Sequence, residues 1–173
     1  GHSRSPQIHA LFARATGQAL QYGLIDVAPA GFAAAVRAFF AGGGRGLNVT
    51  VPHKVSALRL ADTLTPRARR AAAVNTLALG ADGRLLGDNT DGAGLVRDLA
   101  VNLGCTLRGA RVLLLGAGGA ARGVIAPLLE AGVGSLVIHN RHGERAQQLA
   151  SEFSELGPVS VARATPAAAD AGF

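Results

Sequence analysis

Short apolar runs and amphipathic stretches follow one another along the chain, and this pattern predicts strands that alternate with helices. The clearest case lies in the second half. The run from Val112 to Leu115 is too short for a core helix and predicts a strand buried on both faces. A glycine-rich turn follows, and an amphipathic helix then runs to Gly132, a residue type typical of helix ends. A second buried strand from Ser135 to His139 and a helix to Phe153 repeat this order.

The first half carries shorter elements of both kinds. Apolar positions on one helical face predict helices over 6–17, 31–41, 55–61, 67–71 and 92–103. Alternation and short apolar runs predict strands over 20–27, 47–51, 72–79, 85–86 and, near the C-terminus, 159–163. Between two of these strands, Asp82–Gly83 is a strong hairpin signal. The mixture predicts an α/β fold, in which ligands bind at the carboxyl ends of the strands.

The glycine turn after residue 115 has the surroundings that a dinucleotide site requires. Gly116 permits a tight turn, Gly118 lets the backbone approach a pyrophosphate, and Ala121 allows the helix to pack closely on the strand. The phosphates would lie on the free N–H groups and the positive dipole at the helix start. A turn that binds nothing is the alternative. The strand before the motif and the helix after it favour a nucleotide site.

The end of the second buried strand indicates which dinucleotide binds. A site that selects NAD places an acidic residue there to hold the ribose 2′-hydroxyl. This chain has Asn140 and Arg141 instead, and Arg145 follows one turn later. Because guanidinium groups bind phosphate through paired hydrogen bonds, these residues favour NADP over NAD.

Lys54 is the single lysine among 17 basic residues. A lysine amine can be tuned to exchange a proton, whereas arginine stays charged. Thr50 lies near the end of a short predicted strand that stops at Pro52, and Lys54 follows that strand, so we expect both at the ligand-binding edge. Asn75 and Asp91 lie at the ends of other predicted elements. Taken singly, each has an ordinary explanation, as a strand-end residue or as a helix cap.

Two serines, Ser3 and Ser5, lie just before the first predicted helix. Ser5 followed by Pro6 is a good helix start, because serine caps well and proline suits the first helical position. One serine is enough for a cap. The second hydroxyl leaves ligand binding, to a carboxylate or a hydroxyl, as an equal alternative.

Composition narrows the classes of function. Hydrophobic residues make up 49% of the 173 residues, and no apolar run reaches membrane-spanning length. The net charge of +6 comes from scattered arginines, and aromatics reach only 4%, which argues against a nucleic-acid surface. One cysteine excludes an internal disulfide, and His139 and His142 lack further ligands at metal-site spacing. We therefore expect a cytoplasmic protein without a metal, bound neither to nucleic acid nor to membrane.

Six motifs occur in order along essentially the whole chain. They are His-Ser-x-Ser-Pro (2–6), Asn-Val-Thr-Val-Pro-His-Lys (48–54), Ala-Val-Asn-Thr (73–76), Asp-Asn-Thr-Asp-Gly (88–92), Gly-Ala-Gly-Gly-Ala (116–120) and Asn-Arg (140–141). In this order they resemble the shikimate dehydrogenase family, whose members interconvert 3-dehydroshikimate and shikimate with NADPH. The resemblance implies small-molecule ligands and a monomer or homodimer.

The resemblance also implies roles for particular residues. Lys54 and Asp91 would be the catalytic pair. The substrate carboxylate would contact Ser3 and Ser5. The residues implied to hold the ring hydroxyls are Thr50, Lys54, Asn75 and Asp91, and those implied to hold NADP are Gly116, Ala117, Gly118, Gly119, Ala120, Asn140, Arg141 and Arg145.

The implied organisation is an α/β substrate-binding domain over 1–90, a linker helix region over 91–108 and the first half of a Rossmann NADP-binding domain over 109–173. The active site would lie in the cleft between the two domains. Family members have a strand before the first motif and a second half of the Rossmann sheet, so we expect this sequence to be part of a longer protein. The alternatives are a quinate/shikimate dehydrogenase that uses NAD or NADP, and an inactive NADP-binding fragment.

Two positions depart from the family pattern. Ala72 stands where glycine is usual, which we expect to be a small change in packing. His142 stands where threonine is usual, which removes one possible phosphate ligand.

Overall fold

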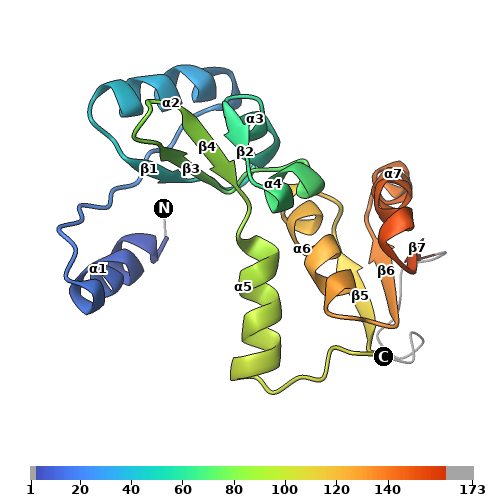
Figure 1. Ribbon diagram of the computed structural model, residues 1–173. Coiled ribbons are helices and arrows are strands. Elements are labelled where there is room, and N and C mark those ends of the chain that lie inside the picture. The colour runs from blue at the N-terminus through green and yellow to red at the C-terminus, as the bar shows by residue number, and fades with distance from the viewer. Residues whose placement is uncertain (1–2, 163–173) are drawn as a thin grey trace.

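The computed structural model describes residues 3–162, which form two separate β-sheets with helices beside and between them (Figure 1). The first sheet has the spatial order β1–β3–β4–β2. β1 (Gly46–Asn48) pairs antiparallel with β3 (Thr76–Leu79), and β2 (Thr63–Leu64) pairs parallel with β4 (Leu85–Asp88). β3 and β4 form the predicted hairpin, in which Gly83 has a φ of 77°, a conformation that favours glycine.

Three helices pack with this sheet: α2 (Phe32–Ala41), which follows the short 3₁₀ turn Pro29–Gly31, α3 (Lys54–Leu58) and α4 (Pro66–Ala71). Their apolar side chains and those of the sheet form one core. Its buried members are Phe32, Val36, Val49, Ala57, Ala68, Val74 and Leu77. Thr50 lies in the turn that follows β1, the hairpin turn follows β3, and the polar segment before Asp91 follows β4.

The second sheet is parallel and has the order β5–β6–β7. Its strands are β5 (Arg111–Leu115), β6 (Ser135–His139) and β7 (Val159–Val161), and its helices are α6 (Gly119–Glu130) and α7 (Gly143–Phe153), the latter extended by the 3₁₀ turn Ser154–Leu156. Apolar side chains of the strands pack against the apolar faces of α6 and α7 here, and together they form one continuous core. Its fully buried large side chains are Ile125, Leu136, Ile138 and Leu149.

One helix joins the two halves. α5 (Asp91–Arg97) begins just after β4, continues as a π-helical turn over Asp98–Asn102, and packs along α6 (Figure 1). The close approach needs a glycine on each helix. A Cβ atom at Gly92 would overlap the carbonyl oxygen of Gly123, so α5 and α6 meet backbone to backbone.

The strand predicted over 20–27 is wrong. This segment has no regular structure and connects α1 (Ser5–Thr16) to the rest of the chain. Leu20, Leu24 and Ile25 are exposed, and only Val27 at the end of the segment packs on the first core. No described strand pairs with the segment, so its alternating pattern has no sheet edge to join among residues 3–162. Its Tyr22 hydroxyl donates to Asn48 Oδ1 at 3.1 Å.

Two further expectations are corrected. β5 is not fully buried on either face: within residues 3–162 it pairs with β6 alone, its three middle residues are half-buried, and Leu115 is 71% exposed. Ser5 is not a helix cap: it is the first residue of α1, and the residue at the cap position is Arg4, whose side chain makes no capping hydrogen bond. Ser3 Oγ instead accepts a 3.3 Å hydrogen bond from the N–H of Ser5.

The strand predicted over 72–79 is shorter than expected, since β3 begins at Thr76, and its first predicted residue belongs to the end of α4 instead. Ala72 adopts the left-handed conformation, with φ 48° and ψ 35°, and ends α4. This backbone disfavours any residue with a Cβ atom and suits glycine. The departure at Ala72 is therefore a matter of backbone conformation and not of packing. The last predicted strand reaches Val161, and Arg163 lies outside the described residues.

Within residues 3–162, no helix combines the length and the apolar character that crossing a membrane requires.

Candidate active site

Lys54, the first residue of α3, is buried and bound to a carboxylate. Only 9% of it is exposed, and its Nζ lies 2.7 Å from Oδ2 of Asp91. Its backbone carbonyl accepts a hydrogen bond from the N–H of Val74 at 2.9 Å, which ties the start of α3 to the segment leading into β3. An ammonium with so little access to water needs such a partner, because an unpaired buried charge is strongly unfavourable.

Asp91 is the first residue of α5, where the helix dipole favours a negative charge. Its two carboxylate oxygens have different partners. Oδ2 accepts from Lys54, and Oδ1 accepts from Nδ2 of Asn75 at 2.8 Å. The carboxylate is thus held between a cation and an amide, and its orientation is fixed on both sides.

Asn75 lies just before β3 and is oriented by its own oxygen. Oδ1 accepts from the N–H of Thr90 at 3.0 Å and from the hydroxyl of Thr76 at 2.8 Å. Because the N–H of Thr90 can only donate, Oδ1 must face it, and the amide nitrogen points to the other side, toward Asp91. Three predicted residues, Lys54, Asn75 and Asp91, therefore form one connected cluster.

Thr50, Ser3 and Ser5 lie outside this hydrogen-bonded cluster. The Thr50 hydroxyl is exposed in the turn after β1, and its carbonyl accepts from the N–H of His53 at 2.8 Å. Ser3 and Ser5 belong to the start of α1, which lies apart from both sheets in Figure 1. Across residues 3–162, no hydrogen bond connects either serine to Lys54, Asn75 or Asp91, so their roles stay predictions.

The polar segment before Asp91 contains a multiply hydrogen-bonded carboxylate, Asp88, that sequence reasoning did not single out. Asp88 accepts from Nε of Arg67 at 2.7 Å, from the second guanidinium nitrogen, and from the hydroxyl of Thr65 at 2.7 Å. These bonds, led by that from Arg67, lower the pKa of Asp88 to about 2. Asp88 also accepts from the N–H of Asn89 at 2.7 Å. The richness of the segment in Asp and Asn was the only signal, and it did not separate these residues from one another.

The glycine turn reaches the cluster directly. Gly116 has a φ of 112° and donates its N–H to the carbonyl of His139 at 2.7 Å, so the turn is tied to the end of β6. A Cβ atom built on Gly119 would lie 3.2 Å from Cβ of Lys54. The first turn of α6 therefore packs against the buried lysine. A Cβ atom on Gly118 would meet nothing within 4 Å, which leaves room for a phosphate beside the backbone.

The predicted 2′-phosphate residues lie at the end of β6 and in the first turn of α7. Arg141 and Arg145 are exposed and have no ion-pair partner among residues 3–162. Asn140 donates to the carbonyl of His142 at 2.9 Å, which shapes the loop that holds them. These donors fit a phosphate on the ribose. No group of three or more His, Cys, Asp or Glu side chains suited to a metal occurs in the described chain.

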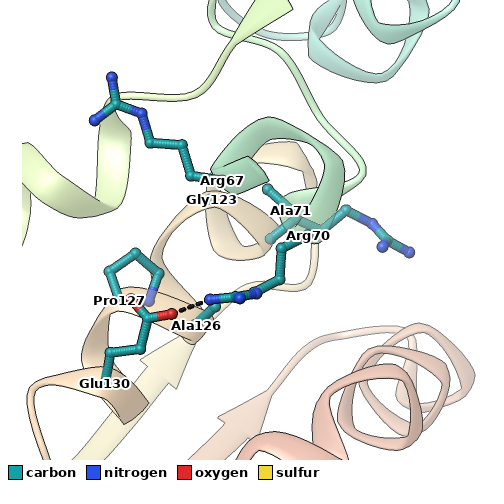
Figure 2. Close-up of a pocket in the computed structure, with 8 residues that line it drawn as sticks. Arg67, Arg70, Ala71, Gly123, Ala126, Pro127 and Glu130 are labelled. Atoms are coloured by element: carbon teal, nitrogen blue, oxygen red, sulfur yellow. Dashed lines mark hydrogen bonds and ion pairs between the residues drawn. The ribbon is translucent and has the colours of Figure 1, made fainter. Parts of the chain in front are cut away.

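A small pocket of about 20 Å³ lies where α4 meets α6, and Figure 2 shows its lining. Arg70 of α4 and Glu130 of α6 form an ion pair there, which connects the two halves of the molecule. The two other arginines of the pocket are also paired, Arg67 with Asp88 and Arg122 with Glu152. The pocket is a structural junction, and the predicted site lies elsewhere.

Comparison with known proteins identifies the family. A family model described as shikimate dehydrogenase substrate binding domain matches residues 1–77, and one described as shikimate / quinate 5-dehydrogenase matches residues 98–170. A curated relative from Aeromonas hydrophila, named shikimate dehydrogenase (NADP(+)), is 62% identical over 159 residues. The chain belongs to the shikimate dehydrogenase family. It covers 58% of the length of that relative, while the match covers 92% of this chain.

Solved structures of shikimate dehydrogenases and their relatives have the same arrangement. An enzyme from Pseudomonas putida described as Ael1 is 46% identical, with a TM-score of 0.82 over 93% of this chain and 59% of its own. A shikimate 5-dehydrogenase from Thermus thermophilus, described as in complex with NADP(H) and shikimate, is 36% identical. Its TM-score is 0.80 over 91% of this chain and 58% of its own. The predicted α/β fold class, with a Rossmann-type second half, is confirmed.

Proposed function

We propose that this chain carries the active site of an NADP-dependent shikimate dehydrogenase, which reversibly reduces 3-dehydroshikimate to shikimate on the route to aromatic amino acids. The observation that carries the proposal is the Lys54–Asp91 pair, 2.7 Å apart, seated against the first turn of the glycine-rich helix α6. A proton-donating group and a dinucleotide turn at one place are what carbonyl reduction requires.

The chemistry assigns a separate task to each residue of the pair. NADPH, when bound, supplies a hydride to the carbonyl carbon of the substrate. The carbonyl oxygen becomes an alkoxide as its π bond breaks, and the Lys54 ammonium donates a proton to that oxygen. The Lys54 amine then takes a proton from solvent. Asp91 stays ionised, orients the amine and stabilises the ammonium form, since an adjacent opposite charge favours the charged state. In the oxidation of shikimate the same steps run backwards.

The substrate side of the site suits a polyol acid. Asn75 and Asp91 present amide and carboxylate groups that can bind ring hydroxyls, and Thr50 offers an exposed hydroxyl from the turn before Lys54. Ser3 and Ser5 would bind the carboxylate, a role that rests on the family resemblance alone. The corresponding division is substrate binding by 1–90, a linker region over 91–108 and cofactor binding by 109–173.

The cofactor side supports NADP. The turn Gly116–Ala120 would hold the pyrophosphate on the N–H groups at the start of α6, and Asn140, Arg141 and Arg145 would surround the 2′-phosphate. The relatives named shikimate dehydrogenase (NADP(+)) support the same choice. Use of NAD, as in a quinate/shikimate dehydrogenase, is the alternative, and cofactor comparison distinguishes the two.

The direct test is shikimate-dependent formation of NADPH by the complete protein that contains this chain. We expect activity with NADP, weak activity with NAD, and a loss of about 10³-fold in kcat for Lys54→Ala, within the range for general acid–base catalysis. Arg59→Ala removes an exposed cation next to α3 and serves as the matched control. Full activity of Lys54→Ala would refute the mechanism. A folded wild type that binds NADP and oxidises no shikimate would favour an inactive NADP-binding protein.

A further inference from the structure

Asn89 is the most buried polar side chain of the described residues. Only Lys54 and Asn89 among polar residues of 3–162 are buried, and Asn89 is 3% exposed. Burying an amide is costly unless its hydrogen bonds are made, so a buried asparagine next to a reactive pair calls for a reason.

The amide of Asn89 connects the two segments that carry Asn75 and Asp91. Its Nδ2 donates to the carbonyl of Ala73 at 3.0 Å, two residues before Asn75. Its Oδ1 accepts from the N–H of Asp91 at 3.2 Å. The donor and the acceptor of one rigid amide thus fix the distance between the segment that leads into β3 and the start of α5. The backbone N–H of Asn89 is itself fixed by the Asp88 carboxylate.

Asn89 also lies against the cofactor helix. A Cβ atom built on Gly123 of α6 would lie 2.8 Å from Oδ1 of Asn89 and 3.0 Å from Oδ2 of Asp91, the oxygen that accepts from Lys54. The absence of a side chain at Gly123 therefore lets the Asn89 amide and the Asp91 carboxylate touch α6. Through these contacts, the Asp91 carboxylate is held at a fixed place beside α6, the helix that would carry the pyrophosphate.

We propose that Asn89 is a positioning residue, which holds Asp91, and through it the Lys54 ammonium, in register with the helix α6. The inference rests on the proposed function and adds to it a residue that touches neither substrate nor cofactor. A displacement of about 1 Å at a reacting group can reduce the rate by roughly 100-fold. Loss of the amide should therefore lower kcat and leave the binding of NADP intact.

The test compares Asn89→Asp and Asn89→Ser with Asn102→Asp. Asn89→Asp keeps the shape but replaces the donor to Ala73 by an oxygen, and Asn89→Ser shortens the side chain. Asn102 donates to Asp98 Oδ1 at 2.7 Å at the exposed end of the helical segment that begins at Asp91, so Asn102→Asp is the matched loss of an amide donor. For both Asn89 variants we expect kcat, counted per NADP-binding site, to fall by about 30- to 100-fold. We also expect the pH profile of kcat to shift, while the Kd for NADP stays within about twofold.

The outcomes are distinct. An unchanged kcat and pH profile with a lowered Tm would show that Asn89 is only structural, and so would failure of both variants to fold and bind NADP. A wild type that is inactive with shikimate would refute the proposed function. The positioning role is then decided by a crystal structure of Asn89→Ser. Separation of Lys54 Nζ and Asp91 Oδ2 well beyond 2.7 Å supports it, and an unmoved pair overturns it.

Discussion

The two halves of the molecule are held together by different kinds of interaction. The β5–β6–β7 half is regular: its strands pair in parallel, its helices cover them, and its core is continuous. The β1–β3–β4–β2 half has strands of two to four residues, and polar side-chain bonds hold together the segments that follow them. The regular half carries the glycine turn and the exposed arginines, and the irregular half carries Lys54. Under the proposed function, the binding geometry would come from backbone packing in one half, and the reactivity from a side-chain network in the other.

The largest expected effect on activity comes from breaking that network at its carboxylate. Asp91→Asn should lower kcat for shikimate oxidation by about 10²- to 10³-fold, because the amide no longer stabilises the Lys54 ammonium. NADP binding, measured by fluorescence titration, should change less than about twofold if the two halves are separable in this way. Asp98→Asn, an exposed carboxylate on the same helix, should behave as wild type. A large loss of NADP affinity in Asp91→Asn would show that the halves are coupled.

The converse change removes the guanidinium groups of the regular half. The double variant Arg141→Ala, Arg145→Ala should weaken NADP binding by about 10²- to 10⁴-fold, since each of the two lost charge-assisted hydrogen bonds contributes about 1.5–3 kcal/mol. Affinity for NAD, which has no 2′-phosphate, should stay nearly constant, and calorimetric titration of both cofactors measures the difference. Arg14→Ala, on α1, controls for the general loss of positive charge. Equal weakening of both cofactors would assign these arginines to the pyrophosphate.

A third change tests how charge stabilises the irregular half. The pKa of Asp88 is lowered from 3.8 to about 2, chiefly by Arg67, so the folded state favours the ionised carboxylate. The resulting stabilisation is present above about pH 4 and is lost as the pH falls toward about 2. It amounts to about 1–2 kcal/mol, because the half-exposed Arg67 is screened by solvent. Urea unfolding at several pH values should show this loss in wild type and much less of it in Asp88→Asn. An identical pH dependence in both would contradict the assignment.

The smallest expected effect concerns one backbone conformation. Ala72→Gly should raise the free energy of unfolding by about 0.5–1 kcal/mol, because the left-handed conformation at this position penalises a Cβ atom. Thermal unfolding measures the gain. Ala38→Gly, in the exposed interior of α2, should instead lose about 1 kcal/mol. A loss of stability in both variants would show that the conformation at Ala72 is not strained.

The same contrast explains what the sequence could predict. The strand at Ser135–His139 and the helix to Phe153 were predicted with the observed ends, because their apolar pattern and their packing agree. The strand predicted over 20–27 was wrong, since a pattern specifies which face is apolar and not whether a neighbour exists to pair with it. β5 is less buried than predicted, because an apolar run does not specify how much of the fold covers each face of the strand.

The candidate site divides in the same way. Lys54 is predicted from its residue type and position, whereas the roles of Asn75 and Asp91 follow from the family resemblance. The structure connects all three by hydrogen bonds. Asn89 and Asp88 were not predicted, because their roles depend on which carbonyls, arginines and N–H groups come near them after folding. Residues that act through another residue leave no periodic pattern in the sequence.

The isolation of Lys54 within this chain has a practical consequence. Because it is the single lysine of the 173 residues, an amine-selective reagent applied to this chain has one side-chain target. That amine is buried and held by Asp91, so its labelling is expected to be slow when the network is intact and faster when it opens. The rate of modification at this one nitrogen would then serve as a built-in reporter of how often the reactive pair separates.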